Sequence, residues 1–180
     1  MEWPPRIVTR RLVLRELTDE DVDFIYAHFS DEDICRFLFD EEPVRSVEEA
    51  LGIINWYKDA GSKDHFRWGL ELKENGHLIG TCGFHFMDRK NNEAEMGYDL
   101  SRNYWKQGFM IEALEAILDV AFNHMRLNRI QAFVYTGNEG SCKLLEKLEF
   151  TQEGIAREKN LYRGKYYDHY CYSLLDRDFK

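Results

Sequence analysis

Three apolar segments in the middle of the chain, separated by two short polar turns, constrain the fold more than any other feature of the sequence. Phe66–Leu72 and His77–Met87 are rich in apolar and aromatic side chains, and the turn sequence Glu74–Gly76, which ends in Asn-Gly, joins them. Asn-Gly between two such segments is the strongest local signal for a β-hairpin. A second polar turn, Asp88–Asn92, leads to another apolar segment, Glu93–Leu100. The pattern therefore predicts three antiparallel strands in succession.

Segments with helical spacing of apolar residues lie on both sides of these strands. Before them, the sequence predicts a short strand at Leu12–Leu17, a helix that Thr18 caps and that buries Val22, Ile25, Tyr26 and Phe29, a short helix starting at Ser30, and a helix from the capping box of Ser46 and Glu49 to near Gly61. After them it predicts a long helix behind Gly108, a buried strand at Arg129–Tyr135, a helix at Gly140–Leu148 and a closing hairpin of Thr151–Lys159 with Tyr166–Leu174. This order predicts a mixed α/β, or α+β, fold with a central twisted, mostly antiparallel sheet of about seven strands and helices on both faces.

The charge of the chain argues against two classes of partner. Its 180 residues include 24 Lys and Arg but 33 Asp and Glu, which gives a formal net charge of −9. General nucleic-acid binders and proteins that bind anionic membranes carry a basic excess. Tyrosines near the C-terminus alternate with Arg and Lys and could stack on RNA, but a hairpin packed on a sheet needs aromatic residues as well. We therefore expect neither nucleic acid nor a membrane as a partner.

The cysteines and histidines show no pattern of a metal site or a disulfide framework. Cys35, Cys82, Cys142 and Cys171 are too far apart for a zinc knuckle or a redox dithiol, and no histidine stands at ligand spacing from a Cys or Glu. The N-terminal residues lack the apolar core of a secretory signal, and no apolar run approaches the roughly 18 residues needed to span a bilayer. The sequence thus favours a cytoplasmic protein with reduced cysteines and no metal cofactor.

The passage from strand to helix over Tyr98–Leu114 is the most informative segment for function. A predicted strand ends here, a short polar loop follows, and Gly108 precedes a long amphipathic helix. The first N–H groups of a helix have no intrahelical acceptor and lie at the positive end of the helix dipole, so they can bind a phosphate. Arg102 and Lys106 add two cationic side chains in the loop. An ordinary strand-to-helix turn explains the same residues, and the usual glycine-rich nucleotide motifs are absent.

Five segments, in order along nearly the whole chain, resemble the GNAT superfamily of acetyl-CoA-dependent N-acetyltransferases. They are Thr9–Arg15, Leu78–Phe84, Glu93–Tyr98, Asn138–Phe150 and Tyr166–Asp168. The similarity is greatest to the branch that acetylates ribosomal proteins and small amines. It implies a GNAT-like fold, a single acetyltransferase domain over residues 8–178, and acetyl-CoA as the co-substrate.

The resemblance also implies which residues bind acetyl-CoA. The family's pyrophosphate signature, Gln/Arg-x-x-Gly-x-Gly/Ala, falls on Trp105–Met110, where Gly108 matches and Trp105 replaces Gln/Arg. Met110 replaces Gly/Ala and is expected to place a bulky side chain near the phosphates, where it would hinder tight binding. The strand Met96–Leu100 would pair with the pantetheine arm. The second helix would contribute Asn138, which is also a plausible N-cap, and it departs from the family at Glu149, where a Gly is usual. The cofactor-binding residues implied in this way are Tyr98, Leu100, Arg102, Trp105, Lys106, Gln107, Gly108, Met110, Ile111, Asn138 and Ser141.

The implied reaction is direct attack of an amine on the acetyl thioester. The amine must be neutral, and because an α-amine has a pKa of about 8 and a side-chain amine one of about 10, a general base must first remove a proton. Glu95 is the first candidate, since it lies on the strand that should line the site, although its alternation with Ala94 and Met96 is also typical of a solvent-facing residue. A backbone N–H at the end of this strand could stabilise the oxyanion. Asp99 has no obvious partner and is expected to be structural.

The leaving thiolate needs a proton donor other than the one usual in the family. The resemblance places a Tyr one residue before the Glu-Lys-Leu run, but this chain has Leu145 there. Ser141 is the first substitute and Cys142 a weaker one, and the thiolate could also leave unassisted. A Ser in the first turn of a helix is as often only a local cap. The catalytic candidates are therefore Glu95 and Ser141.

The sequence leaves the acceptor open. Ten carboxylates lie between Asp19 and Glu42, a segment that borders the acceptor pocket according to the resemblance. They would attract a cationic acceptor, but most of them stand at predicted helix starts, where acids are favoured anyway. A protein N-terminus, a polyamine, an aminoglycoside and an amino acid all remain possible acceptors, and a monomer and a homodimer are equally compatible with the sequence. The alternative function, suggested by Leu145 and Met110, is a non-catalytic acyl-CoA-binding sensor.

Overall fold

The three predicted strands form the centre of an eight-stranded sheet in the computed structural model, which describes residues 5–38, 42–58 and 64–180. The strands are β1 (Ile7–Val8), β2 (Leu12–Glu16), β3 (Phe66–Leu72), β4 (Leu78–Asp88), β5 (Glu93–Leu100), β6 (Arg129–Tyr135), β7 (Thr151–Tyr162) and β8 (Lys165–Leu175). Their spatial order is β1-β2-β3-β4-β5-β6-β8-β7, and among these described strands only β5 and β6 pair in parallel. The mixed, mostly antiparallel fold is confirmed, with the two-residue β1 as a strand that the sequence did not predict. The turn between β3 and β4 has Gly76 at φ +74°, as an Asn-Gly turn requires.

Five α-helices connect and cover the strands: α1 (Val22–Phe29), α2 (Glu32–Cys35), α3 (Val47–Lys58), α4 (Phe109–Asp119) and α5 (Glu139–Lys147), among the residues described. The helix predicted behind Thr18 begins as a 3₁₀ turn, Asp19–Asp21, before α1. Asp31 caps α2, not Ser30 as predicted, because its side chain accepts the hydrogen bond of the Asp33 N–H at 2.8 Å. The predicted end of α3 near Gly61 lies outside the described residues.

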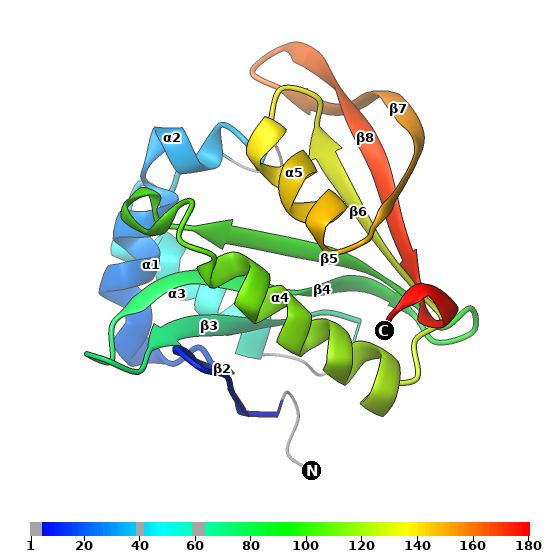
Figure 1. The fold of residues 1–180 in the computed structure, drawn as a ribbon. Helices are drawn as coiled ribbons and strands as arrows, with labels where there is room; N and C mark the ends of the chain where they lie inside the picture. Colours follow the sequence, from blue (N-terminus) through cyan, green and yellow to red (C-terminus); the bar gives the residue numbers. More distant parts are fainter. Residues whose placement is uncertain (1–4, 39–41, 59–63) are drawn as a thin grey trace.

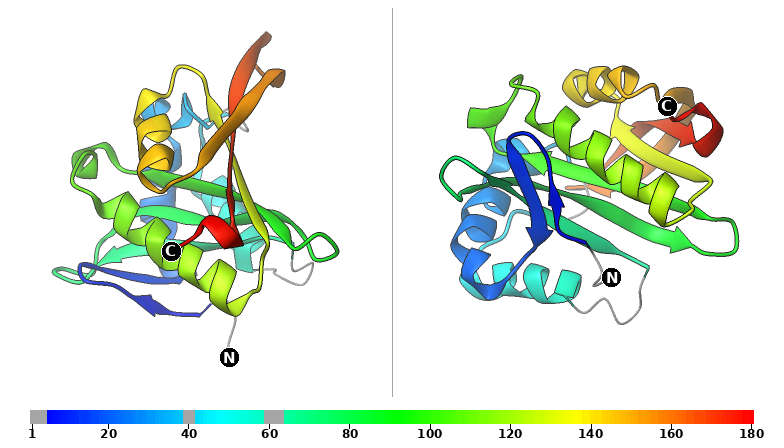
Figure 2. Two further views of the ribbon diagram at one scale, coloured as in Figure 1. Left: turned by 45° about the vertical axis from the view of Figure 1, so that its right-hand side comes forward. Right: turned by 60° about the horizontal axis from the view of Figure 1, so that its bottom comes forward.

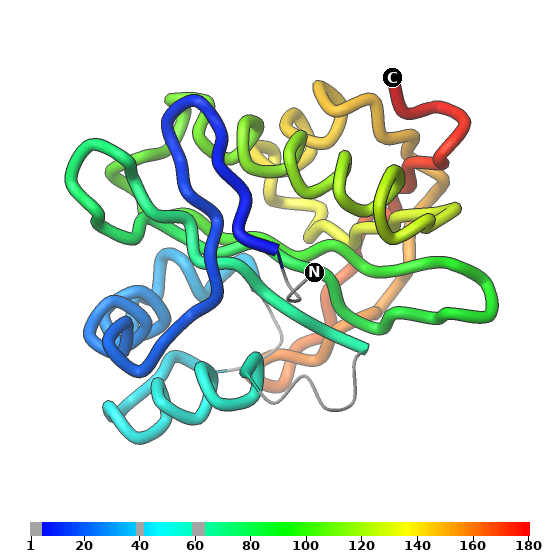
Figure 3. Tube along the Cα trace, turned by 90° about the horizontal axis from the view of Figure 1, so that it is seen from below, coloured from blue at the N-terminus to red at the C-terminus, as the bar shows by residue number. Residues whose placement is uncertain are grey.

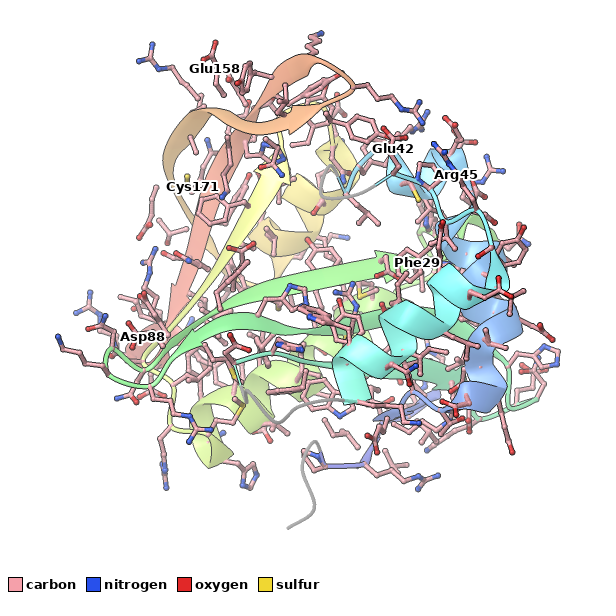
Figure 4. The ribbon with its side chains drawn as sticks, turned by 180° about the vertical axis from the view of Figure 1, so that it is seen from behind. Phe29, Glu42, Arg45, Asp88, Glu158 and Cys171 are labelled. Carbon is pink, nitrogen blue, oxygen red and sulfur yellow. The ribbon has the colours of Figure 1, made fainter. Side chains whose placement is uncertain are left out.

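The helices lie on both faces of the sheet, which gives the molecule three layers (Figure 3). Helices α4 and α5 pack on one face, over the larger hydrophobic core, which includes Leu114, Ile117 and Leu145. Helices α1 and α3 cover the opposite face, as the view from behind shows (Figure 4), over a smaller cluster around Ile25 and Ile54. The described chain contains no helix with the length and apolar character that crossing a membrane needs.

The sheet divides where β5 meets β6. The parallel ladder between them has three residue pairs, from Glu93–Arg129 to Glu95–Gln131, and beyond these pairs the two strands diverge (Figure 1). Strand β5 continues beside β4, whereas β6 continues beside β8, and the β7–β8 hairpin projects away from the rest of the sheet (Figure 2). Since β4 occupies only one edge of β5, the residues of β5 after Glu95 have a backbone edge that faces the diverging strand.

Candidate active site

The start of α4 has the geometry that anion binding requires. Gly108 is the N-cap with φ +77°, a left-handed conformation that favours glycine, and it is exposed. Lys106, two residues earlier, is also left-handed with φ +61°. Met110 is 6% exposed and packs in the larger core, so its side chain points away from the loop. The expected obstruction by Met110 is therefore not present, because the periodicity of the helix turns this position inward.

Arg11 lies beside this helix start, a placement that the sequence analysis did not find. Its guanidinium donates to the carbonyl oxygen of Gln107 at 2.9 Å, forms an ion pair with Glu112 at 2.7 Å and lies 4.1 Å from the ring centroid of Phe109. A Cβ on Gly108 would be 3.5 Å from Arg11 Nη2. The Thr9–Arg15 segment marked Arg11 as part of the family resemblance, but no local pattern connects it with a helix about a hundred residues later.

The loop between β5 and α4 is held by its own side chains. Trp105 donates its indole N–H to the carbonyl oxygen of Leu100 at 2.6 Å, and Gln107 donates its side-chain N–H to the carbonyl oxygen of Asn103 at 2.7 Å. Arg102 forms ion pairs with Asp33 and, at 3.5 Å, with Asp31, both next to or within α2. These contacts fix the loop in front of α4. They also direct the Arg102 guanidinium toward α2, so a contact between Arg102 and a phosphate stays a prediction.

The two predicted catalytic residues, Glu95 and Ser141, lie on opposite sides of β5. Along this strand, Tyr98 and Leu100 face α4 and α5, the side on which Ser141 lies. Glu95 and Asp99 face α1 and α3, as the alternation of a strand requires. Glu95 is partly buried and pairs with His85 of β4 and Gln131 of β6, at the last rung before β5 and β6 diverge. The predicted base therefore stands at the point where the sheet divides.

Ser141 reaches β5 from the first turn of α5. Its hydroxyl lies 2.5 Å from the phenol oxygen of Tyr98. Its backbone N–H donates to Asn138 Oδ1 at 3.1 Å, so Asn138 is the N-cap of α5, as its residue type predicted. Leu145 is fully buried in the larger core, and Ile111 of α4 packs against the same core. The structure thus brings Tyr98, Asn138 and Ser141 together on one face of β5.

Asp99 has several partners, contrary to the expectation from the sequence. The Arg67 guanidinium of β3 forms an ion pair with it, Thr81 of β4 donates its hydroxyl at 2.6 Å, and His28 of α1 donates Nε2–H at 2.7 Å. Ser101 lies 3.0 Å from the other nitrogen of His28. Arg67, Thr81, His28 and Asp99 are all buried. The Arg67 and His28 side chains hold the pKa of the Asp99 carboxyl well below its usual value. This network connects α1 to β3, β4 and β5 on the face of the sheet that α1 and α3 cover. These contacts support the structural role expected of Asp99.

His85 joins this network to the strand position of Glu95. Its Nε2 lies 3.3 Å from Arg67 Nη1 and 3.4 Å from the Tyr57 hydroxyl. Burial and the nearby Arg67 charge lower the pKa of His85 to about 3. The imidazole is therefore neutral at pH 7, and Nε2 accepts the hydrogen bond from Arg67. A base this weak does not take a proton from an amine, and the role of Glu95 as the base stays a prediction.

The described part of the chain contains no group of three His, Cys, Asp or Glu side chains that could hold a metal ion.

Comparison with known proteins identifies the kind of enzyme to which this chain is similar. The family described as acetyltransferase (GNAT) domain matches residues 11–151. The chain is 36% identical over 172 residues to the uncharacterized N-acetyltransferase YoaA of Bacillus subtilis, covering 95% of this chain and 97% of the relative. It is 30% identical over 183 residues to the [ribosomal protein uS5]-alanine N-acetyltransferase of Escherichia coli, covering 97% and 92%. The crystal structure of a GNAT-family acetyltransferase from Bacillus anthracis superimposes with a TM-score of 0.84 at 25% identity, covering 96% of this chain and 99% of the other.

Proposed function

The chain belongs to the GNAT acetyltransferase family and is an acetyl-CoA-dependent N-acetyltransferase, and on this premise we propose that its acceptor is the α-amine of a protein N-terminus. The relative from Escherichia coli is named for an alanine of ribosomal protein uS5, and acetylation of an alanine nitrogen in a protein requires a free N-terminal α-amine. An acceptor of this kind would place the reaction in the cytoplasm. The same relatives favour an enzyme over a non-catalytic acyl-CoA sensor.

The pairing of the acidic segment is the observation that carries this choice of acceptor. Six of the eight described carboxylates between residues 19 and 42 form ion pairs within the protein: Asp19 with Lys58, Asp21 with Arg15, Asp31 and Asp33 with Arg102, and Glu32 and Glu42 with Arg163. Figure 4 shows Glu42 near the β7–β8 hairpin, whose turn contains Arg163. A polyamine would have to compete with three arginines and one lysine for these carboxylates. An acceptor with one amine and a peptide backbone needs no such displacement.

The residues at the start of α4 fit the pyrophosphate of acetyl-CoA. The N–H groups of Phe109, Met110 and Ile111 lack intrahelical acceptors, and the exposed glycine before them leaves room for a close approach. The free backbone edge of β5 after Glu95 would pair with the pantetheine amides. Acetyl-CoA supplies the thioester, and the chain supplies the groups that move protons around it.

Glu95 is proposed as the general base and Ser141 as the proton donor to sulfur. They lie on opposite faces of β5, so the amine would approach from the α1 and α3 face and the thiolate would leave on the α4 and α5 face. The amine loses its proton to Glu95, directly or through water, as its nitrogen bonds to the acyl carbon. Positioned acid–base catalysis of this kind contributes roughly 10²–10⁴-fold in rate.

Ligand binding and turnover test the proposal in two steps. Acetyl-CoA at about 100 times its dissociation constant should stabilise the fold by roughly 2.7 kcal/mol, a rise in Tm of about 5–10 °C, whereas ATP and NAD should not. Release of CoA thiol is then followed with three acceptors: a peptide with a free N-terminal Ala, the same peptide with an acetylated N-terminus and an internal Lys, and spermidine. Turnover of the first acceptor alone is expected, and Glu95→Gln should slow it at least tenfold. Turnover of spermidine but not of the free peptide would contradict the proposed acceptor.

A further inference from the structure

An apolar residue occupies the position at which the family resemblance expects a proton-donating Tyr. Leu145, on α5, is fully buried and offers only hydrocarbon. When the amine forms its bond to the acyl carbon, the carbon–sulfur bond breaks and its electron pair stays on sulfur. A proton donor to that sulfur would then be another group on the α4 and α5 face of β5. Two hydroxyls meet there, those of Tyr98 and Ser141, at 2.5 Å from each other.

This pair of hydroxyls connects the two parts of the divided sheet. Tyr98 is three residues beyond Glu95, on β5, where β5 has already left β6. Ser141 belongs to α5, which follows β6 in the chain. The hydrogen bond between them therefore spans the two sides between which the thioester would lie. A ligand that binds along the free edge of β5 would therefore lie close to the hydroxyls of Tyr98 and Ser141.

Both hydroxyls are held in place by the surrounding structure. The backbone of Ser141 is fixed by the Asn138 cap, and the ring of Tyr98 packs against the larger core. Burial raises the pKa of the Tyr98 phenol, so it keeps its proton at neutral pH and is available as a donor. Ser141 can accept this hydrogen bond at Oγ and still present its own O–H to a third atom.

We propose that Tyr98 is a positioning residue that orients the Ser141 hydroxyl and makes it the proton donor to the departing sulfur of CoA. This inference rests on the proposed function. Ser141 Oγ gives its proton to sulfur, and the proton that Glu95 removed from the amine returns through water to Ser141 Oγ. Tyr98 keeps its phenol proton throughout and donates a hydrogen bond to Ser141 Oγ, which stabilises the charge that develops there. The net change is one amide and one thiol formed from one amine and one thioester, with no proton gained or lost.

Tyr98→Phe tests this assignment because it removes one oxygen and keeps the ring in the core. We expect kcat to fall about 10–100-fold, while KM for acetyl-CoA and Tm change little, since only a transition-state interaction is removed. Tyr170→Phe, which removes a phenol oxygen from a ring that also packs against the larger core, is the matched control and should leave kcat unchanged. Ser141→Thr keeps a hydroxyl and should retain more activity than Ser141→Ala.

The double variant, Tyr98→Phe with Ser141→Ala, tests whether the two hydroxyls act together in one step or independently of each other. If Tyr98 acts through Ser141, adding Tyr98→Phe to Ser141→Ala should cost less than about twofold in kcat. A structural cross-link between β5 and α5 would instead lower Tm in each variant and leave kcat of the folded protein unchanged. Independent effects on kcat that multiply in the double variant would overturn the assignment.

A second readout needs no acceptor. CoA is bound to the protein, and its thiol is titrated by the absorbance of the thiolate. Donors aimed at sulfur stabilise the thiolate, so the bound thiol should titrate below the value of free CoA, and Tyr98→Phe should raise its pKa by about one unit. Equal thiol titrations in the wild type and Tyr98→Phe would overturn the inference even if the enzyme is active. Failure of the wild type to bind CoA at all would instead overturn the proposed function, and this inference with it.

Discussion

Arg11 donates a hydrogen bond from Nη1 to the backbone carbonyl oxygen of Gln107 at 2.9 Å, and this contact connects the start of the first long strand to the start of α4. The same guanidinium forms an ion pair with Glu112 one turn into the helix. A planar guanidinium can make both contacts at once, whereas an ammonium cannot match that geometry. Arg11 therefore fixes the loop that precedes Gly108 relative to the helix that follows it.

Arg11→Lys should weaken acetyl-CoA binding without changing the chemical step. The loop before Gly108 would lose its support from β2, and the helix N–H groups would be less well positioned for the pyrophosphate. We expect Kd for acetyl-CoA, measured by calorimetry, to rise about tenfold, which corresponds to roughly 1.4 kcal/mol, with kcat changed less than twofold. The neighbouring exposed Arg10→Lys is the control. An unchanged Kd in Arg11→Lys would show that the loop holds its conformation without this contact.

Asp99→Asn should destabilise the fold strongly because it removes the carboxylate that neutralises Arg67. Breaking one partner of a buried ion pair costs roughly 3–5 kcal/mol, and at about 2–4 °C per kcal/mol for a chain of this size the Tm should fall by roughly 6–20 °C. Asp23→Asn, at an exposed position of α1, should change Tm by no more than about 2 °C. Equal Tm values for the two variants would mean that the network adds no stability.

Stability should fall between pH 6.5 and 5 because of His85. Its pKa is about 3 in the folded protein and about 6.5 in the unfolded chain. The unfolded state therefore binds more protons over this interval, and the free energy of unfolding decreases as the pH falls. The decrease is at most about 1.4 kcal/mol per pH unit, or roughly 2 kcal/mol between pH 6.5 and 5.

Urea unfolding of the wild type and His85→Gln at both pH values isolates this effect. Most carboxylates titrate below pH 5, so their contribution cancels in the comparison. The wild type should lose more stability than His85→Gln on going from pH 6.5 to 5. Parallel losses in the two proteins would show that His85 does not contribute to the pH dependence.

Features with a local cause could be predicted from the sequence, and features made by distant strands could not. The β3–β4 turn follows from Asn75 and Gly76, and the cap of α5 follows from Asn138, because each acts within a few residues of itself. The partners of Asp99 are 71 residues away at His28 and 32 at Arg67, and no periodicity connects them. The register of β3, β4 and β5 brings Arg67 and Asp99 to one face of the sheet, and the packing of α1 on that face adds His28.

The candidate site also contains both kinds of feature: some have a local cause in the sequence, and others depend on distant residues. The sequence predicted the strand β5 and the loop before α4, but it treated Met110 as an obstacle, because a motif gives the position of a residue and not the direction of its side chain. The structure shows that the helix turns Met110 into the core. Arg11 was missed because its contact with Glu112 spans 101 residues. The roles assigned to Glu95 and Ser141 stay predictions that the kinetic experiments above test.

Glu149→Gly should stabilise the protein, because this position has a backbone conformation that glycine adopts without strain. Glu149 follows the end of α5 with φ +63°, in the left-handed region where helices commonly end with glycine. The strain of a non-glycine residue there is of order 1 kcal/mol, and the exposed pair of Glu149 with Lys180 at 3.5 Å offsets little of it. We expect Tm to rise by about 2–4 °C, whereas Glu146→Gly inside α5 should lower it by a similar amount. A lower Tm for Glu149→Gly would mean that the Glu149 side chain, not the backbone conformation, determines stability at the end of α5.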